Sequence, residues 1–296
     1  MKKTLLFLAL LAFAGTVSFS QPVIDQNDMP NVGDTIRFST VIDLSSIDYT
    51  LTGTNYSWDF SSLIGTIERV DTFVAVMSTP WYYYPDFNNI FDPAHKATIA
   101  QPQADITQMP TIQFTEVYNF YKETSSAFSQ VGLGATINSI PMPIKYDYPD
   151  VLFNFPLTQG QKDSSNYSYN INIPAIVYYG QSRKLINLVD GWGTIITPFD
   201  TFPAVRILST SYIHDTIHVD SLFFGFSQDR IELEYKWMAD NMGLPVFKVT
   251  ERQGFLASTT AEYRTEYVPI PSNIPETNPV ITFVDIFPNP ASEESS

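Results

Sequence analysis

Apolar and polar residues alternate with a period of two along most of this chain, and this pattern constrains the fold more than any other feature. In one example, polar residues alternate with Tyr167, Tyr169, Ile171 and Ile173. Side chains of a strand point to its two faces in turn, so such a run places its apolar residues on one face. No long segment has the period of about 3.6 residues that marks a surface helix. The best helical candidate is a turn or two around Pro93–Ala100.

Proline and glycine divide the chain into short segments, with 21 prolines and 13 glycines in 296 residues. Frequent turn signals between short strands favour antiparallel connections. We therefore predict an all-β fold with little helix outside the N-terminal segment. Antiparallel sheets are expected to form a β-sandwich or a strongly curved sheet. Within it, Thr194–Thr197 and Phe202–Ile213 are expected to form one hairpin.

The first 20 residues have the three parts of a secretory signal peptide. Two lysines precede an apolar run from Leu5 to Ala14, and the small residues Ser18 and Ser20 stand at the −3 and −1 positions of a cut before Gln21. The apolar run is shorter than the roughly 20 residues that span a bilayer. We expect residues 1–20 to be removed on export, and we expect no integral membrane segment in the mature chain.

Composition suggests how the mature chain is divided. Residues 139–150 are rich in proline and tyrosine, and we interpret them as a hinge. We therefore expect an N-terminal β-module over residues 21–145 and a C-terminal β-module over residues 146–268. Residues 269–280 contain spaced prolines, which favour an extended and semi-rigid linker. Residues 281–296 form a last, separate segment.

This last segment, ITFVDIFPNPASEESS, resembles the opening of the type A C-terminal sorting domain of type IX secretion cargo. The strand that opens such a domain corresponds to Val284–Phe287, and the turn that follows corresponds to Pro288, Asn289 and Pro290. We expect the sorting domain to be truncated here. The alternative is an ordinary turn in a polar tail. The resemblance implies the type IX machinery as a partner, and export through the periplasm to the cell surface or the medium.

The body of the chain is similar to a recurring class of extracellular proteins that carry this sorting domain. The resemblance spans most of residues 28–268 and is carried by four segments: Asp28–Thr35, Asn55–Leu63, Phe155–Gly160 and Asp190–Ile207. It implies secretion and β-structure, and it implies no particular activity.

The chain is strongly acidic, with 16 Lys and Arg against 31 Asp and Glu and a net charge of −15. The signal peptide holds two of the basic residues and no acidic one, so the mature chain carries −17. Nucleic acid and anionic membrane surfaces attract a positive face, and this charge argues against both as partners. Cysteine is absent, which excludes thiol catalysis and zinc–thiolate sites.

Motifs for catalysis, cofactors and metals are lacking, so no catalytic residue, cofactor or metal site is assigned. His214 and His218 fall in a predicted strand, where residues four apart lie about 13 Å from each other and cannot share one metal ion. A glycoside hydrolase needs only two carboxylates brought together in space. Its candidate carboxylates are Glu116, Glu232, Glu234 and Glu251. The alternative is that these glutamates occupy solvent-facing strand positions.

Aromatic side chains are the candidates for a ligand-binding site, namely Trp81, Tyr82, Tyr83, Tyr84 and Trp192. Flat aromatic faces can stack on sugar rings, which predicts an extracellular glycan or a surface protein as partner. The alternative is that these residues cover a sheet edge or fill an interface. Gly191 and Gly193 flank Trp192, where a bulge or close packing would require glycine.

Three hydroxyl residues follow aspartates in a pattern that resembles the O-glycan acceptor of bacteria with this secretion system, namely Thr35, Thr216 and Ser221. The alternative is ordinary polar residues on edge strands. The sequence as a whole predicts a secreted or cell-surface β-protein that acts as a non-catalytic binding or adhesion module. A carbohydrate-active hydrolase with paired carboxylates and a structural surface component are the two alternatives.

Overall fold

The computed structural model describes residues 20–106, 113–174, 177–219, 224–254 and 257–266. Nearly all of the predicted signal peptide, Ser221, the predicted linker and Pro288–Pro290 lie outside the described residues. At the expected cleavage site, Ser20 is exposed and Gln21 is partly buried.

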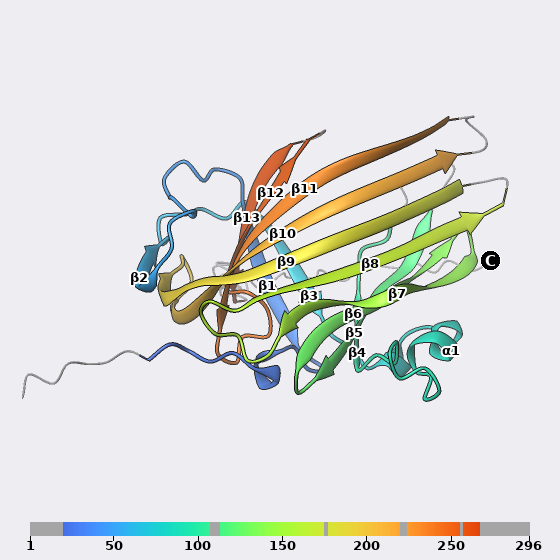
Figure 1. The fold of residues 1–296 in the computed structure, drawn as a ribbon, viewed down its shortest axis with the longest axis horizontal. Helices are drawn as coiled ribbons and strands as arrows, with labels where there is room; N and C mark the ends of the chain where they lie inside the picture. Colours follow the sequence, from blue (N-terminus) through green and yellow to red (C-terminus); the bar gives the residue numbers. More distant parts are fainter. Residues whose placement is uncertain (1–19, 107–112, 175–176, 220–223, 255–256, 267–296) are drawn as a thin grey trace, which may run out of the picture. The chain divides into compact units, whose positions relative to one another are not determined.

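The described chain is mostly β-structure, which confirms the predicted all-β fold (Figure 1). Its strands form a nine-stranded and a four-stranded sheet. The larger sheet contains β1 (Thr35–Val41), β2 (Thr54–Asp59), β3 (Ile67–Thr72), β8 (Lys162–Ile173), β9 (Val177–Ile196), β10 (Thr201–Val219), β11 (Phe224–Ala239), β12 (Phe247–Gln253) and β13 (Ser258–Thr265). The smaller sheet contains β4 (Ile99–Pro102), β5 (Phe114–Thr124), β6 (Ala127–Ile137) and β7 (Ile140–Asn154). The helical elements are α1 (Tyr84–Phe87) and the 3-10 turns η1 (Gln26–Asp28), η2 (Val76–Ser78) and η3 (Trp81–Tyr83).

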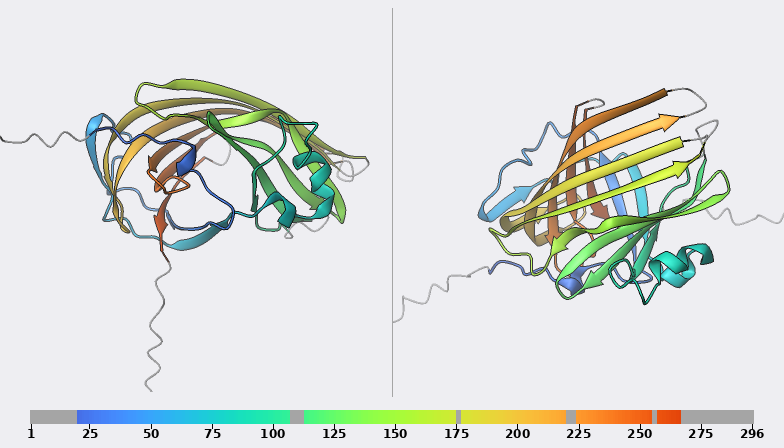
Figure 2. Two further views of the ribbon diagram at one scale, coloured as in Figure 1. Left: turned by 90° about the horizontal axis from the view of Figure 1, so that it is seen from below. Right: turned by 45° about the vertical axis from the view of Figure 1, so that its right-hand side comes forward.

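Long antiparallel strands make up most of the larger sheet. Its order is β2-β9-β10-β11-β12-β13-β1-β3, with β8 also paired to β9, and only the β2–β9 pair is parallel. Strands β9 and β10 form the predicted hairpin, with Ile196 opposite Thr201. Figure 2 shows the long strands β8–β11 arching over the smaller sheet.

The two sheets approach each other along two lines. After β3, Val74 exchanges two backbone hydrogen bonds with Ala100 of β4, at 2.8 and 3.0 Å. On the other side, β7 lies beside β8, where the Val151 amide donates to the Ser165 hydroxyl at 2.8 Å. The sheets therefore enclose a space between them, which we call the interior.

The predicted modules do not coincide with the two sheets. The boundary expected between residues 145 and 146 falls inside β7, and β1 pairs with β13. The segment interpreted as a hinge lies almost entirely within β7. Pro141 and Pro143 are accommodated because β7 is an edge strand of the smaller sheet, where a missing amide donor is tolerated.

Of the helical turn predicted around Pro93–Ala100, the structure shows a single hydrogen-bonded turn, in which the Lys96 amide donates to the carbonyl of Asp92 at 3.0 Å. Ile99 and Ala100 belong to β4, and the short helix α1 lies earlier, at Tyr84–Phe87. Pro85 stands in the first turn of α1, a position where proline costs no helical hydrogen bond. The apolar and aromatic run before Pro93 therefore holds the short helix.

Both faces of the larger sheet are buried at the end where β2 lies. In β11, Met238 packs in the interior against a cluster that includes Phe38 of β1. Its neighbour Trp237 packs on the opposite, outer face, with ring centres 5.7 Å from Trp58 and 5.4 Å from Phe60. The segment that carries these two aromatics therefore covers the outer face of the sheet here, and Trp237 is fully buried.

Glycines allow β2 to approach β9 closely. A bulge in β9 lies opposite Arg206 and Ile207, as expected near Gly191. A Cβ atom on Gly193 would lie 1.9 Å from the carbonyl oxygen of Tyr56 in β2. The predicted need for glycine beside Trp192 is therefore explained by close packing of the β2 backbone.

Replacing Gly193 by alanine is expected to lower the free energy of unfolding by about 1–3 kcal/mol, because β2 must shift to accept the new methyl group. Urea-induced unfolding followed by tryptophan fluorescence measures this change. Gly53→Ala is the matched control, since a Cβ atom there would meet no atom closer than 3.6 Å. Equal stability of the two variants would contradict the close approach of β2.

Candidate functional site

Charged side chains line up across adjacent strands on the interior face of the larger sheet. Lys236 of β11 lies opposite Lys248 of β12, and Lys248 lies opposite Glu262 of β13. Directly opposed residues on one face have Cβ atoms about 4.5–5.5 Å apart. The Nζ atom of Lys236 is 5.5 Å from the ring centre of Phe153 in β7, so this row faces the smaller sheet.

The carboxylate of Glu234 forms ion pairs with both lysines. Glu234 lies two positions from Lys236 in β11 and shares its face. Its carboxylate oxygens are 2.8 Å from the Nζ of Lys236 and 4.0 Å from the Nζ of Lys248. Burial alone would raise the pKa of Glu234, but the charges of Lys236 and Lys248 outweigh it and lower the pKa to about 2. Glu234 is therefore a carboxylate at every physiological pH.

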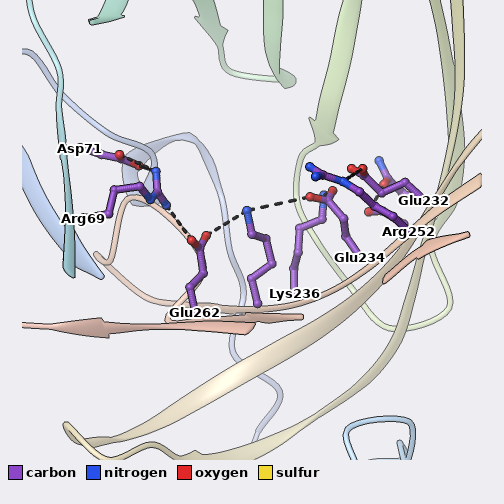
Figure 3. A network of polar contacts seen from close by, with 10 residues as sticks. Arg69, Asp71, Glu232, Glu234, Lys236, Arg252 and Glu262 are labelled. Atoms are coloured by element: carbon purple, nitrogen blue, oxygen red, sulfur yellow. Dashed lines mark hydrogen bonds and ion pairs between the residues drawn. The ribbon is translucent and has the colours of Figure 1, made fainter. Parts of the chain in front are cut away.

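Glu262 extends the network to the far edge of the sheet (Figure 3). Its carboxylate is 2.9 Å from the Nζ of Lys248 and 2.9 Å from a terminal nitrogen of Arg69 in β3. The other terminal nitrogen of Arg69 is 2.5 Å from Asp71. Burial raises the pKa of Asp71, and the charge of Arg69 opposes that shift. The alternating charges thus form a continuous chain from β11 to β3.

A second ion pair lies deeper in the interior. Arg183 of β9 donates to Asp150 of β7, and the Asp150 side chain is only 2% exposed. The guanidinium lies 5.2 Å from the ring centre of Tyr167, which stacks on Tyr146. Neither the Nε of Arg183 nor the Oδ1 of Asp150 has a hydrogen-bond partner among the described residues. Burial raises the pKa of Asp150, although the charge of Arg183 lowers it in part.

Two cavities adjoin this network. The inner one has a volume of about 260 Å³ and lies between the sheets, lined from one side by Tyr121 and Phe153 and from the other by Lys236 and Arg183. The other one, which we call the outer pocket, has a volume of about 300 Å³ and lies over β12 and β13. It is on the interior face of the sheet, the face that carries Lys248 and Glu262, and not on the outer face that carries Trp237. Both are lined by Arg69, Lys248 and Glu262. These shared residues place the outer pocket directly beside the inner cavity.

The four candidate carboxylates do not converge. Glu232 and Glu234 share the interior face of β11, where Glu232 accepts from the Nε of Arg252 at 2.9 Å. Glu251 follows Thr250 on the opposite face of β12 and accepts from Tyr49 at 2.6 Å. Glu116 lies in β5 of the smaller sheet and accepts from Tyr82.

The aromatic run at residues 81–84 is divided between core and surface. Trp81 is 73% exposed, whereas Tyr83 is fully buried and donates to the carbonyl of Glu116 at 3.1 Å. Tyr82 packs against the core of the smaller sheet. The Tyr84 hydroxyl lies 2.6 Å from the carbonyl oxygen of Met77 and 2.9 Å from that of Thr79, and its single proton stabilises this loop.

Trp192 does not join the run at residues 81–84. It lies in β9, partly buried against the interior cluster, and its amide donates to the carbonyl of Gly53 at 3.0 Å. Of the predicted glycan acceptors, Thr35 is exposed at the start of β1. Thr216 is partly buried in β10, with its hydroxyl 2.9 Å from that of Ser227. Ligand binding and glycosylation at these residues stay predictions.

The interior position of these charged residues was not predicted from the sequence, because their pattern is typical of a solvent-exposed face. Glu232, Glu234 and Lys236 alternate with large apolar residues, and charged positions of an alternating strand normally face water. One available signal was that the residues alternating with them include Tyr235 and Trp237. Such large aromatic residues indicate that the opposite face of this strand is buried as well. Lys248 and Glu262 carried no local signal, since only the strand register brings them together.

Comparisons with known proteins add one finding, a structural likeness. No family model matches the chain, and no curated protein matches it. A solved structure of a candidate lipoprotein from Parabacteroides distasonis ATCC 8503 aligns with 82% of this chain and 98% of that one, at 11% sequence identity and a TM-score of 0.28. A likeness at this level defines neither fold nor function. Within the described ranges, no helix is long and apolar enough to cross a membrane.

Proposed function

We propose that this chain is an exported, non-catalytic binding protein of the bacterial surface whose ligand enters the interior between the two sheets. The observation that carries this proposal is the pair of adjoining cavities along the charged network. Binding sites for small molecules are concave, occupy roughly 300–1,000 Å³, and combine apolar walls with a few convergent polar groups. The inner cavity supplies aromatic walls and the outer pocket supplies polar groups.

Pairing of the interior charges favours binding over catalysis. A general acid needs a pKa near the working pH. Glu234, at the centre of the network, instead has its pKa lowered to about 2 by two lysines. Its carboxylate holds a fixed geometry and accepts hydrogen bonds, which suits recognition of a polar ligand.

We propose an extracellular glycan, bound through one of its ends, as the ligand. Sugar rings combine hydroxyl groups with apolar faces, and the cavities offer both hydroxyls and aromatic rings. Export rests on the signal peptide of residues 1–20, and delivery to the surface by the type IX machinery rests on the motif at Pro288–Pro290. A surface protein is the alternative partner.

Blocking the outer pocket tests this proposal. Thr260 and the adjacent Thr259 of β13 are both exposed, but only Thr260 lines the pocket. Calorimetric titration with glucose, galactose, their uronic acids and short oligosaccharides is expected to detect binding to the unaltered protein and to Thr259→Trp. Thr260→Trp is expected to bind none of them. Absence of binding by every sugar, or equal binding by both variants, would contradict the proposal.

A further inference from the structure

We infer that the outer pocket recognises a carboxylate group on its ligand, so that the bound sugar is a uronic acid. This inference rests on the proposed function and specifies the ligand further. Six side chains of the pocket carry it: Thr40, Arg69, Lys248, Thr250, Arg252 and Thr260.

The cations that line the pocket wall are ion-paired, and they differ in how much of their donor capacity is used. Three cations, Arg69, Lys248 and Arg252, line it against one carboxylate, that of Glu262. The protein as a whole carries −15, with only 16 basic residues in 296. An anion is therefore repelled by the molecule at large. Within the wall, Arg69 and Lys248 are both paired with Glu262, and Arg252 is paired with Glu232 through its Nε. Arg252 is thus the cation of this wall that an anionic group can still engage.

Arg252 provides the geometry for a carboxylate. Its side chain is 58% exposed, and its Nε donates to Glu232 at 2.9 Å. Among the described residues, no hydrogen bond engages its two terminal nitrogens. A guanidinium presents these donors as a planar fork that matches the two oxygens of a carboxylate. The bond to Glu232 fixes the guanidinium without using that fork.

Threonine hydroxyls complete the site for a sugar. Thr250 of β12 lies opposite Thr260 of β13. Thr40 of β1 lies opposite Glu262 of β13. In the described part of the chain, none of their three hydroxyls has a hydrogen-bond partner. Each hydroxyl can donate one hydrogen bond and accept two, which suits the hydroxyl groups of a sugar ring. The wall therefore pairs an anion-binding side with a hydroxyl-binding side.

Titration of the protein with galacturonate and with galactose tests the inference, because these sugars differ only in the carboxylate at C6. We expect galacturonate to bind at least about tenfold more tightly at low salt, and this advantage to shrink as salt screens the charges. Arg252→Gln should remove the advantage. Lys162→Gln, which removes one positive charge from an exposed position of β8 outside the pocket, should retain it.

The outcomes separate this inference from the proposed function. If the unaltered protein binds the two sugars equally and Thr260→Trp binds neither, recognition of a carboxylate is contradicted and the proposed binding site is supported. An unchanged preference in Arg252→Gln would also overturn the inference. Failure of every sugar to bind would overturn the proposed function itself.

Discussion

Replacing Glu234 by glutamine is expected to lower the free energy of unfolding at pH 7 by about 3–5 kcal/mol, the usual cost of removing one partner from a buried ion pair. The substitution leaves Lys236, whose side chain is only 8% exposed, facing Lys248 without the carboxylate between them. The two ammonium groups then repel each other in a poorly solvated interior.

The loss should depend on pH in a defined direction. The pKa of Glu234 falls from an ordinary 4.5 to about 2 in the folded chain. Its stabilising contribution is therefore complete above about pH 4.5 and disappears as pH falls toward 2. The stability difference between the unaltered protein and Glu234→Gln should be largest at pH 7 and smaller at pH 3.

Urea unfolding at pH 7, 5 and 3 measures this difference. Glu232→Gln is the matched control, because its partner Arg252 is largely exposed and such pairs contribute only about 0–1 kcal/mol. A loss for Glu234→Gln that is as small as the control, or that stays constant down to pH 3, would refute the assigned role of Glu234.

Replacing Arg206 by methionine is the second substitution expected to have a large effect, again about 3–5 kcal/mol. The Arg206 side chain is 1% exposed and donates to the carbonyls of Thr50 and Leu51. Its guanidinium also lies 5.1 Å from the ring centre of Tyr235 and 3.7 Å from Asp190. Methionine fills similar space but leaves these buried acceptors without a donor.

The effect of Arg206→Met should be concentrated in one segment. Hydrogen exchange should accelerate at residues 43–53, which the guanidinium holds against the outer face, before it accelerates in β9–β11. Arg206→Lys is the control, since it keeps the charge and one donor and should lose less stability. Uniform acceleration throughout the described chain would contradict a local role.

The fold class followed from the sequence because it depends on local periodicity. Tyr167 to Ile173 alternate in β8 as predicted, and the β9–β10 hairpin lies where glycine and proline delimit it. The division into modules could not be predicted from the sequence, because it depends on which distant strands pair. Nothing in the local pattern of residues 35–41 indicates that β13 is their neighbour.

The candidate site was less accessible to sequence analysis for a related reason. Charged residues on an alternating strand have the same pattern whether their face meets water or a second sheet. Glu234 and Lys236 are buried only because β7 lies across from them, as the contact of Lys236 with Phe153 shows. Tyr83 illustrates the opposite case, since it was predicted in a binding surface and is buried in the core of the smaller sheet.

The pairing of β1 with β13 has a consequence for the order of events during folding. One neighbour of β1 is supplied by residues 258–265, at the far end of the described chain. Contacts so distant in sequence form slowly, because a long loop must close before they are gained. The larger sheet is therefore incomplete until residues 258–265 have been synthesised. A chain with such pairing stays incompletely folded for longer than one in which every strand pairs with its neighbour in sequence.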